Sequence, residues 1–267
     1  MKRYTAIYYL WIICSFLFSC KKQVRNIYDI PPVDSAHISI TNISPSITDL
    51  RLFLNNKPLS LPDSPVVYGK TVFASYIRNP GTYLPDTVAL PYINVSPGYQ
   101  QLTFSSFEND NSVGVLNNNF EAGATYSLFL TDTVVHGKIT PVLLKDNVRN
   151  TDTSKSEIRF LNLSPDTPPL DVIAYPGASY NGYKLFSDCA YIPNNYNSFV
   201  NGESFAEIDR GIYYFEAAVA GTSKVLMGGY LIIPGQQIIT IYTKGYFSGN
   251  GTKALDVGVI QYPQNGK

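Results

Sequence analysis

The chain has 267 residues with 20 basic and 20 acidic side chains, so its formal net charge is zero at neutral pH. That balance excludes the broad basic surface that nucleic-acid-binding proteins carry, and we expect no nucleic-acid partner. Aromatic residues reach 13%, and there are 19 glycines and 18 prolines. This composition suits short strands joined by turns, and no segment keeps a helical hydrophobic period over three turns. The expected fold class is therefore all-β.

The N-terminus predicts export and lipidation. Lys2 and Arg3 precede an uncharged apolar run that is too short to span a bilayer, which takes about 20 apolar residues. The run ends in Leu17-Phe18-Ser19-Cys20, which resembles a lipobox, with an aliphatic residue three places before the cysteine and a small residue just before it. We predict that residues 1–19 are a signal peptide and that Cys20 is the acylated, palmitate-carrying first residue of the mature protein.

The alternatives at this end are an ordinary cleaved signal and an uncleaved signal anchor. Residues 20–35, which include Pro31-Pro32, are the expected tether between the membrane and the folded part. Cleavage leaves Cys189 as the one cysteine besides Cys20, so no disulfide can form within the mature domains. The fold must depend on core packing, and we expect Cys189 to be a small buried apolar residue.

An internal repeat gives the domain organisation. An alternating strand that ends in Asn-x-Ser-Pro, at residues 38–45, is followed by a second strand at 50–54, and this pair recurs at 158–165 and 170–174. Later segments also correspond: residues 97–104 with 210–217, 120–130 with 232–242, and 139–144 with 254–262. About seven short strands per copy predict two tandem β-sandwiches of immunoglobulin type, at 36–145 and 157–264, with a polar linker at 146–156.

Four glycines stand where a turn enters a strand. Gly98 and Gly211 correspond in the two copies, and so do Gly123 and Gly235. Glycines at such positions commonly supply positive φ, which glycine adopts without steric cost.

The second copy carries Asn162-Leu163-Ser164-Pro165-Asp166, followed by Leu170-Asp171-Val172. At these residues the chain resembles the domain of unknown function 4397, and the resemblance covers nearly all of residues 36–262 as two units. The resemblance implies an exported, often lipid-anchored or cell-wall-associated β-sandwich module with no known catalytic activity. The first copy departs from the pattern, because Ser46 and Arg51 stand where the second copy has Asp166 and Asp171.

Catalytic machinery is not evident in the sequence. The two histidines, His37 and His136, lack cysteines or carboxylates at metal-ligand spacing, and no Gly-x-Ser-x-Gly occurs. Glu203, Glu207 and Asp209 are close together, as paired carboxylates are in glycosidases, but solvated strand residues are the favoured interpretation. We therefore predict no enzyme, no cofactor and no metal, with a glycan-active hydrolase as a remote alternative.

Aromatic residues interleaved with Asn and Gly mark the candidate binding site. The tyrosines are Tyr175, Tyr180, Tyr183, Tyr191 and Tyr196. Such rings can stack on sugars or form a protein interface. Alternatively, half of them pack beneath their own loop. A binding protein should expose Tyr180, Tyr183 and Tyr196, whereas a spacer should bury them.

The leading hypothesis is a non-catalytic cell-envelope lipoprotein, anchored in the outer membrane by its lipid, that binds or presents a glycan or an envelope protein. The alternative is a structural spacer or accessory subunit of an adhesion or nutrient-uptake assembly. The sequence leaves open which face of the membrane, periplasmic or surface, holds the protein. Three motifs resemble an O-glycosylation acceptor: Asp34-Ser35-Ala36, Asp86-Thr87-Val88 and Asp132-Thr133-Val134.

Overall fold

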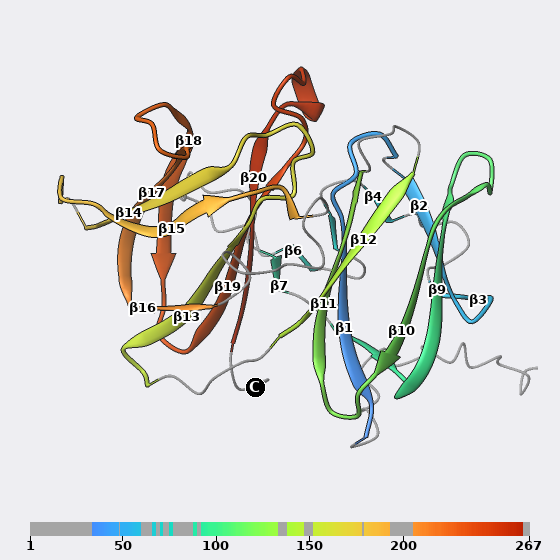
Figure 1. The fold of residues 1–267 in the computed structure, drawn as a ribbon. Helices are drawn as coiled ribbons and strands as arrows, with labels where there is room; N and C mark the ends of the chain where they lie inside the picture. The colour runs from blue at the N-terminus through green and yellow to red at the C-terminus, as the bar shows by residue number, and fades with distance from the viewer. Residues whose placement is uncertain are drawn as a thin grey trace, which may run out of the picture. The chain divides into compact units, whose positions relative to one another are not determined.

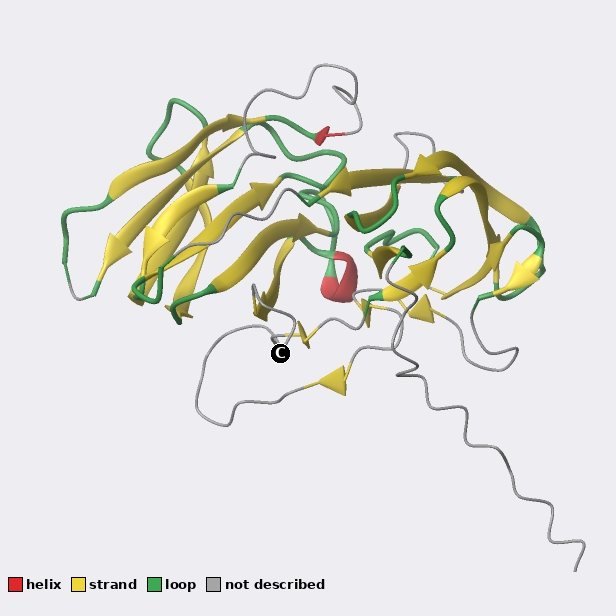
Figure 2. Ribbon diagram, turned by 90° about the horizontal axis from the view of Figure 1, so that it is seen from below, coloured by secondary structure: helices red, strands yellow, loops and turns green. Residues whose placement is uncertain are grey.

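In the computed structural model, the structure describes residues 34–47, 49–59, 66–67, 70–71, 75–76, 88–89, 92–132, 138–146, 152–177, 179–192 and 205–263. The predicted signal peptide, Cys20 and all but the last two residues of the tether lie outside these ranges. The described part is strands and loops, with short 3₁₀ turns such as Gly251–Lys253 (Figure 2). Within it, no helix is long and apolar enough to cross a membrane. Residues 33–267 form one compact unit.

The first module is a sandwich of two sheets (Figure 1). Sheet A has the order β12-β11-β1-β5 with β8 also paired to β1, and sheet B has the order β10-β9-β2-β3 with β4 also paired to β2. The strands are β1 (Ala36–Asn42), β2 (Asp49–Leu54), β3 (Lys57–Pro58), β4 (Val66–Val67), β5 (Lys70–Thr71), β8 (Ile93–Val95), β9 (Gly98–Ser106), β10 (Ser112–Phe120), β11 (Thr125–Asp132) and β12 (Ile139–Lys145).

The second module repeats this plan. Sheet D has the order β15-β14-β17-β18, and sheet C has the order β16-β13-β19-β20-β7-β6. The strands are β13 (Lys155–Leu161), β14 (Leu170–Pro176), β15 (Tyr183–Cys189), β16 (Ala206–Asp209), β17 (Gly211–Val219), β18 (Val225–Ile233), β19 (Gln237–Lys244) and β20 (Asp256–Pro263). The two short strands at its edge, β6 (Ser75–Tyr76) and β7 (Val88–Ala89), come from the first copy.

The predicted all-β sandwich is confirmed, and strand pairing gives the equivalence of the two copies. In each copy the first strand pairs in parallel with a late strand, so that Ile38 lies opposite Tyr126 and Ile158 lies opposite Ile239. Equivalent residues are therefore 120 positions apart in the first two strands and 113 apart from β9 to β11. Inward residues of facing sheets form one core in each module, built around Phe104 in the first.

The expected glycine conformations hold in the first module only. Gly98 has φ +93° and Gly123 has φ +71°, but neither Gly211 nor Gly235 has a positive φ. The residue 113 positions after Gly123 is Gln236, which itself takes φ +58°. Gly235 is small for another reason, because a Cβ there would lie 1.8 Å from the carbonyl oxygen of Thr153.

The linker prediction is corrected at both ends. Asp146 is buried, and Lys155 and Ser156 already belong to β13, while residues 147–151 lie outside the described part. A third apolar cluster joins the modules, because the chain brings their equivalent sheets A and C together. Its buried members are Ile43, Phe129, Val142 and Leu144 from the first module and Leu161, Leu163, Ile192, Ile238, Tyr242 and Ile260 from the second.

Candidate binding face of the second module

The outer face of sheet D carries aromatic and aliphatic side chains. Successive residues of a strand point to opposite faces, so the neighbours of buried core residues point outward. On β17, Tyr213 and Phe215 are buried, while Ile212 is 54% exposed. The outward residues Ile173 and Tyr175 on β14, Ile212 and Tyr214 on β17, and Tyr230 and Ile232 on β18 are here called the tyrosine face.

The rings of the tyrosine face contact one another across three strands. The Tyr214 ring lies between Tyr175, with centroids 6.2 Å apart, and Tyr230, with centroids 4.9 Å apart. The Tyr175 hydroxyl donates to Glu216 Oε2 at 2.9 Å, and this hydrogen bond, followed by burial, raises the pKa of Tyr175. The Tyr175 phenol is therefore uncharged at neutral pH.

A glycine supports the packing of these rings. A Cβ at Gly228 would lie 2.7 Å from Tyr214 Oη, so the missing side chain gives that phenol room above β18. The tyrosine face is thus an ordered surface with half-exposed members, since Tyr230 is 55% and Ile232 is 50% exposed.

The same face of the first module has a different chemistry. The equivalents of Ile212, Tyr214, Tyr230 and Ile232 are Tyr99, Gln101, Asn117 and Asn119, and those of Ile173 and Tyr175 are Phe53 and Asn55. Gln101 Nε2 donates to Asn117 Oδ1 at 3.1 Å, and the Gln101 N–H donates to Asn55 Oδ1 at 3.0 Å. Four amides, with Phe53 and Tyr99, thus cover the sheet in the first copy, and only tyrosine and isoleucine occupy these positions in the second.

The predicted tyrosines separate in the structure. Tyr175 belongs to the tyrosine face, Tyr180 is 99% exposed, and Tyr183 is exposed on the edge strand β15. Burial raises the pKa of Tyr183, against a hydrogen bond with Tyr213 that lowers it. Tyr196 lies outside the described residues.

The prediction for Tyr191 is wrong, because its ring is buried and its hydroxyl donates to the backbone oxygen of Asp132 in the other module. Asp132 also receives hydrogen bonds from the hydroxyls of Ser44, Ser46 and Tyr246. Burial raises the pKa values of Tyr191 and Tyr246, and the bond to Asp132 raises that of Tyr246 further. These hydrogen bonds join the two modules at their boundary.

The Asn-x-Ser-Pro-Asp motif serves structure. Asn162 Nδ2 donates to Cys189 O at 3.1 Å, and Ser164 Oγ donates to Gly245 O at 2.8 Å. Asp166 accepts the backbone N–H groups of Phe247 and Ser248. Burial acts to raise the pKa of Asp166, but the bonds from Ser248 and Phe247 outweigh it and lower that pKa.

The first copy has different residues at the positions of Asp166 and Asp171. Ser46 occupies the position of Asp166, and the carboxylate comes instead from Asp132. Asp171 accepts Gly221 N–H at 3.1 Å in the β17–β18 turn, and its counterpart Arg51 pairs with Asp110 in the equivalent β9–β10 turn. Asp171 and Arg51 therefore both link the second strand of their copy to a hairpin turn, although their charges are opposite.

Three of the residues considered for catalysis have described surroundings. Glu207 pairs with Lys155, Asp209 is exposed, and His37 Nδ1 contacts Asn94 Oδ1 at 2.9 Å. His136 and Glu203 lie outside the described residues. Cys189 is buried as expected, and burial, followed by the charge of Asp171, raises its pKa to about 12. Among the residues with assigned positions, no group of three or more metal-binding side chains occurs.

Two of the O-glycosylation motifs have their acceptors, Thr87 and Thr133, outside the described part. In the third motif, Ser35 is 6% exposed, so the folded unit does not present this hydroxyl.

Sequence reasoning missed Ile212, Tyr214, Tyr230 and Ile232. The available signal was the run Ile212-Tyr213-Tyr214-Phe215, in which both strand faces are apolar rather than only one. In a strand with one solvent-exposed face, polar residues normally alternate with apolar ones. A run that is apolar on both faces therefore indicates that the outer face is covered or binds a partner.

Comparison with known proteins gives a family but no activity. No curated protein matches the chain. One similar solved structure is the Bacillus anthracis TIE protein, with 10% identity and a TM-score of 0.23, covering 86% of this chain and 44% of that one. Another is a leucine-rich repeat protein from Bacteroides thetaiotaomicron, with 6% identity and a TM-score of 0.18, covering 78% of this chain and 25% of that one.

Likenesses with TM-scores this low do not support a shared fold, and the chain spans less than half the length of either protein. The family model of the domain of unknown function DUF4397 matches residues 36–173, which include the whole first module, β13 and most of β14. Because this match covers more than half of the chain, the protein belongs to the DUF4397 family.

Proposed function

We propose that the protein is a non-catalytic lipoprotein of the cell envelope whose second module binds an envelope protein through the tyrosine face. The carrying observation is the contrast between the two copies. Four of the six outward positions hold amides in the first module, whereas all six hold tyrosine or isoleucine in the second. Solvent alone would favour polar residues on both, so a contacting surface accounts for the difference.

The composition of the tyrosine face favours a protein partner. Ile212 and Ile232 are half exposed and have no hydrogen-bonding group with which to recognise a hydroxyl. Tyrosine is enriched in protein interfaces because its ring buries apolar area while its hydroxyl stays satisfied. A partner with its own apolar patch would cover the isoleucines and the Tyr230 ring together.

A glycan is the second candidate, supported by Tyr180. This ring is 99% exposed beside Asn181, an arrangement suited to stacking on a sugar and bonding its hydroxyls. The two candidates predict different sensitive residues, because a glycan on this loop would not need Tyr230 or Ile232.

The test compares Tyr230→Ser with Tyr99→Ser, which removes a ring from the equivalent sheet of the first module. Each full-length protein is cross-linked in intact cells, isolated, and its attached proteins are quantified. A tyrosine at an interface centre contributes at least tenfold in affinity, about 1.4 kcal/mol. We expect about a tenfold loss of a defined envelope protein in Tyr230→Ser and none in Tyr99→Ser. Equal recovery of the envelope protein with both variants would refute a protein partner on this face. Binding of a glycan that is lost in Tyr180→Ser would favour the glycan instead.

The membrane anchor is proposed from Cys20 and the apolar run before it. Two or more acyl chains anchor stably, since each buried CH₂ contributes about 0.8 kcal/mol. We expect labelled palmitate to enter the wild type and to be absent from Cys20→Ser, which should leave the membrane fraction. Palmitate incorporation into Cys20→Ser would contradict this anchor.

Proteinase treatment of intact cells distinguishes the two orientations. Loss of the second module would place the tyrosine face outside the cell and favour adhesion or capture. Protection until the outer membrane is opened would favour a periplasmic partner, and an accessory subunit of an envelope assembly would then be the better description.

A further inference from the structure

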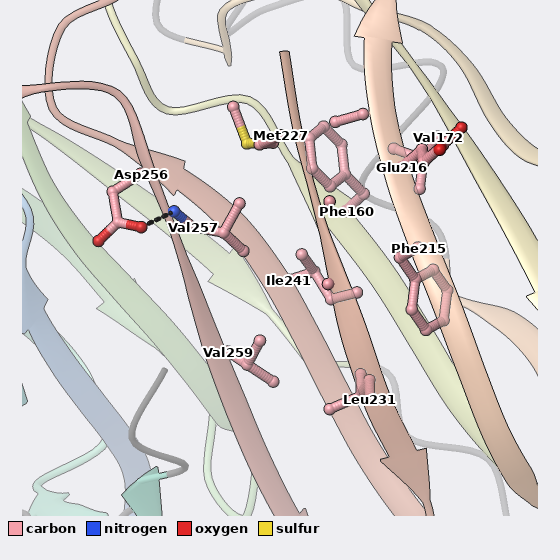
Figure 3. A pocket seen from close by; sticks show the side chains of 13 residues that line it. Phe160, Val172, Phe215, Glu216, Met227, Leu231, Ile241, Asp256, Val257 and Val259 are labelled. Carbon is pink, nitrogen blue, oxygen red and sulfur yellow. Dashed lines mark hydrogen bonds between the residues drawn. The ribbon is translucent and has the colours of Figure 1, made fainter. Parts of the chain in front are cut away.

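A partly open, largely apolar pocket of about 220 Å³ lies between the two sheets of the second module. Figure 3 shows Phe160 and Ile241 from sheet C and Phe215 from sheet D bordering the same space. The pocket lies along the edge strand β18 and the facing part of β20, with Met227, Leu231 and Val259 among its walls.

Comparison with the first module explains how this space arises. Strand pairing makes Gly229 the equivalent of Leu116 and Ala217 the equivalent of Phe104. Phe104 is fully buried and Leu116 packs against the same core, whereas a Cβ built at Gly229 has no atom within 4 Å. Two large core side chains of one copy are thus absent at the matching positions of the other.

A third position acts at the edge of the sandwich. In the first module, β10 approaches β12 at Gly114, where an added Cβ would lie 3.0 Å from the Ile139 carbonyl oxygen. Its equivalent in the second module is Met227, whose long side chain lines the pocket. Glycine thus allows close approach at this edge in the first copy, whereas a methionine that lines the pocket occupies the same position in the second.

The carboxylates beside the pocket already have partners. Asp256 pairs with Lys244 at 3.1 Å and accepts Val257 N–H at 2.8 Å. Glu216 accepts the Tyr175 hydroxyl on the outer face of the sheet. The remaining walls are apolar side chains and glycine backbone, so the pocket offers no described counter-charge to an ion.

We propose that this inter-sheet pocket binds an uncharged apolar group, either a short alkyl chain or a single aromatic ring. A cavity of about 150 Å³ lined by apolar side chains takes up benzene, so 220 Å³ accommodates a group of this size. The proposal does not depend on the tyrosine face, which lies on the opposite side of sheet D.

The test uses Met227 as a reporter. The chain has two methionines, Met1 and Met227, so methyl-labelled methionine gives one internal signal in residues 33–267, the compact unit with every described strand. The protein is titrated with 1-octanol and with toluene while the Met227 methyl resonance is followed. We expect a saturable shift with at least one probe, and which one binds tells whether a chain or a ring fits.

Gly229→Leu restores the side chain of the first module and should abolish the saturable shift. If Gly229→Leu does not fold, Gly229→Ala takes its place and should weaken binding of the probe. Tyr230→Ser, on the opposite face of the sheet, should leave the titration unchanged. Absence of a saturable shift with both probes would overturn the proposal, as would a shift of equal affinity in the folded Gly229 variants.

Discussion

Arg159 shows how one side chain can join two modules. It is 1% exposed and pairs through Nη1 with Asp146 Oδ1 at 2.8 Å. Its Nε donates to Thr240 Oγ1 at 2.9 Å and its Nη2 donates to Ser127 Oγ at 3.0 Å. Ser127 belongs to the first module and Thr240 is its counterpart in the second, so the guanidinium lies between equivalent strands. Burial raises the pKa of Asp146, and the charge of Arg159 opposes that rise.

Arg159→Met should destabilise the protein by about 3–5 kcal/mol, because it leaves a buried carboxylate without its cation. Urea unfolding at neutral pH measures the change. Arg51→Met removes a partly exposed ion pair with Asp110 and should cost less than about 1 kcal/mol. Similar costs for the two variants would contradict the assigned role of Arg159.

Asp171 gives a pH-dependent prediction. Its hydrogen bond from Lys184 and those from the Asp188 and Gly221 N–H groups lower its pKa, against a smaller effect of burial. A carboxylate with a lowered folded-state pKa contributes stability above its unfolded pKa of about 3.9 and loses it as the pH falls through the folded value. Wild type should therefore exceed Asp171→Asn in unfolding free energy above pH 4, with the difference shrinking on further acidification.

Urea unfolding at a series of pH values tests this, and Asp209→Asn controls for the loss of one exposed negative charge. A difference between wild type and Asp171→Asn that stays constant from neutral pH to pH 2 would contradict an ionised, hydrogen-bonded Asp171.

At the scale of strands, two glycines in the second module have opposite surroundings. A Cβ at Gly258 on β20 would lie 2.1 Å from the Tyr242 ring, whereas a Cβ at Gly229 on β18 would meet open space. Gly258 must be glycine because the Tyr242 ring approaches its Cα closely. Gly229 leaves open the space that a side chain on β18 could fill.

Gly258→Ala should destabilise the protein by about 1–3 kcal/mol through overpacking. Gly229→Ala should instead stabilise it by about 0.5–1 kcal/mol, because alanine restricts the unfolded chain and fits the strand. Thermal and urea unfolding of both variants give the sign directly. Stabilisation by Gly258→Ala would contradict the packing of Tyr242 on β20.

The sequence predicts strands better than it predicts their surfaces. Alternation located the first two strands of each copy, because one face of each had to be buried. It could not separate the buried Tyr213 from the outward Tyr214, since both are tyrosine. Tyr191 was misjudged because its burial depends on a contact with Asp132, which is 59 residues away along the chain. Loop composition carries no information on such a contact.

At the scale of the whole molecule, the two copies contact each other through equivalent residues. Phe129 and Tyr242 correspond, and their ring centroids lie 5.4 Å apart. Ile43 and Leu163, which follow the first strand of each copy, join the same cluster. This is an isologous contact formed within one chain, and it leaves the outer faces of sheets B and D to differ.

The shared cluster should make the modules unfold together. We expect far-ultraviolet circular dichroism and tyrosine fluorescence to follow one urea transition with the same midpoint. Two separated transitions would contradict a common cluster that couples the modules.

The most direct test of the tyrosine face uses a photo-cross-linking amino acid in intact cells. It is placed at Tyr230 in one protein and at Asn117, the equivalent position of the first module, in another. We predict a discrete adduct with an envelope protein from position 230 and none from position 117. No adduct from 230, or the same adduct from both positions, would contradict a partner-binding face on the second module.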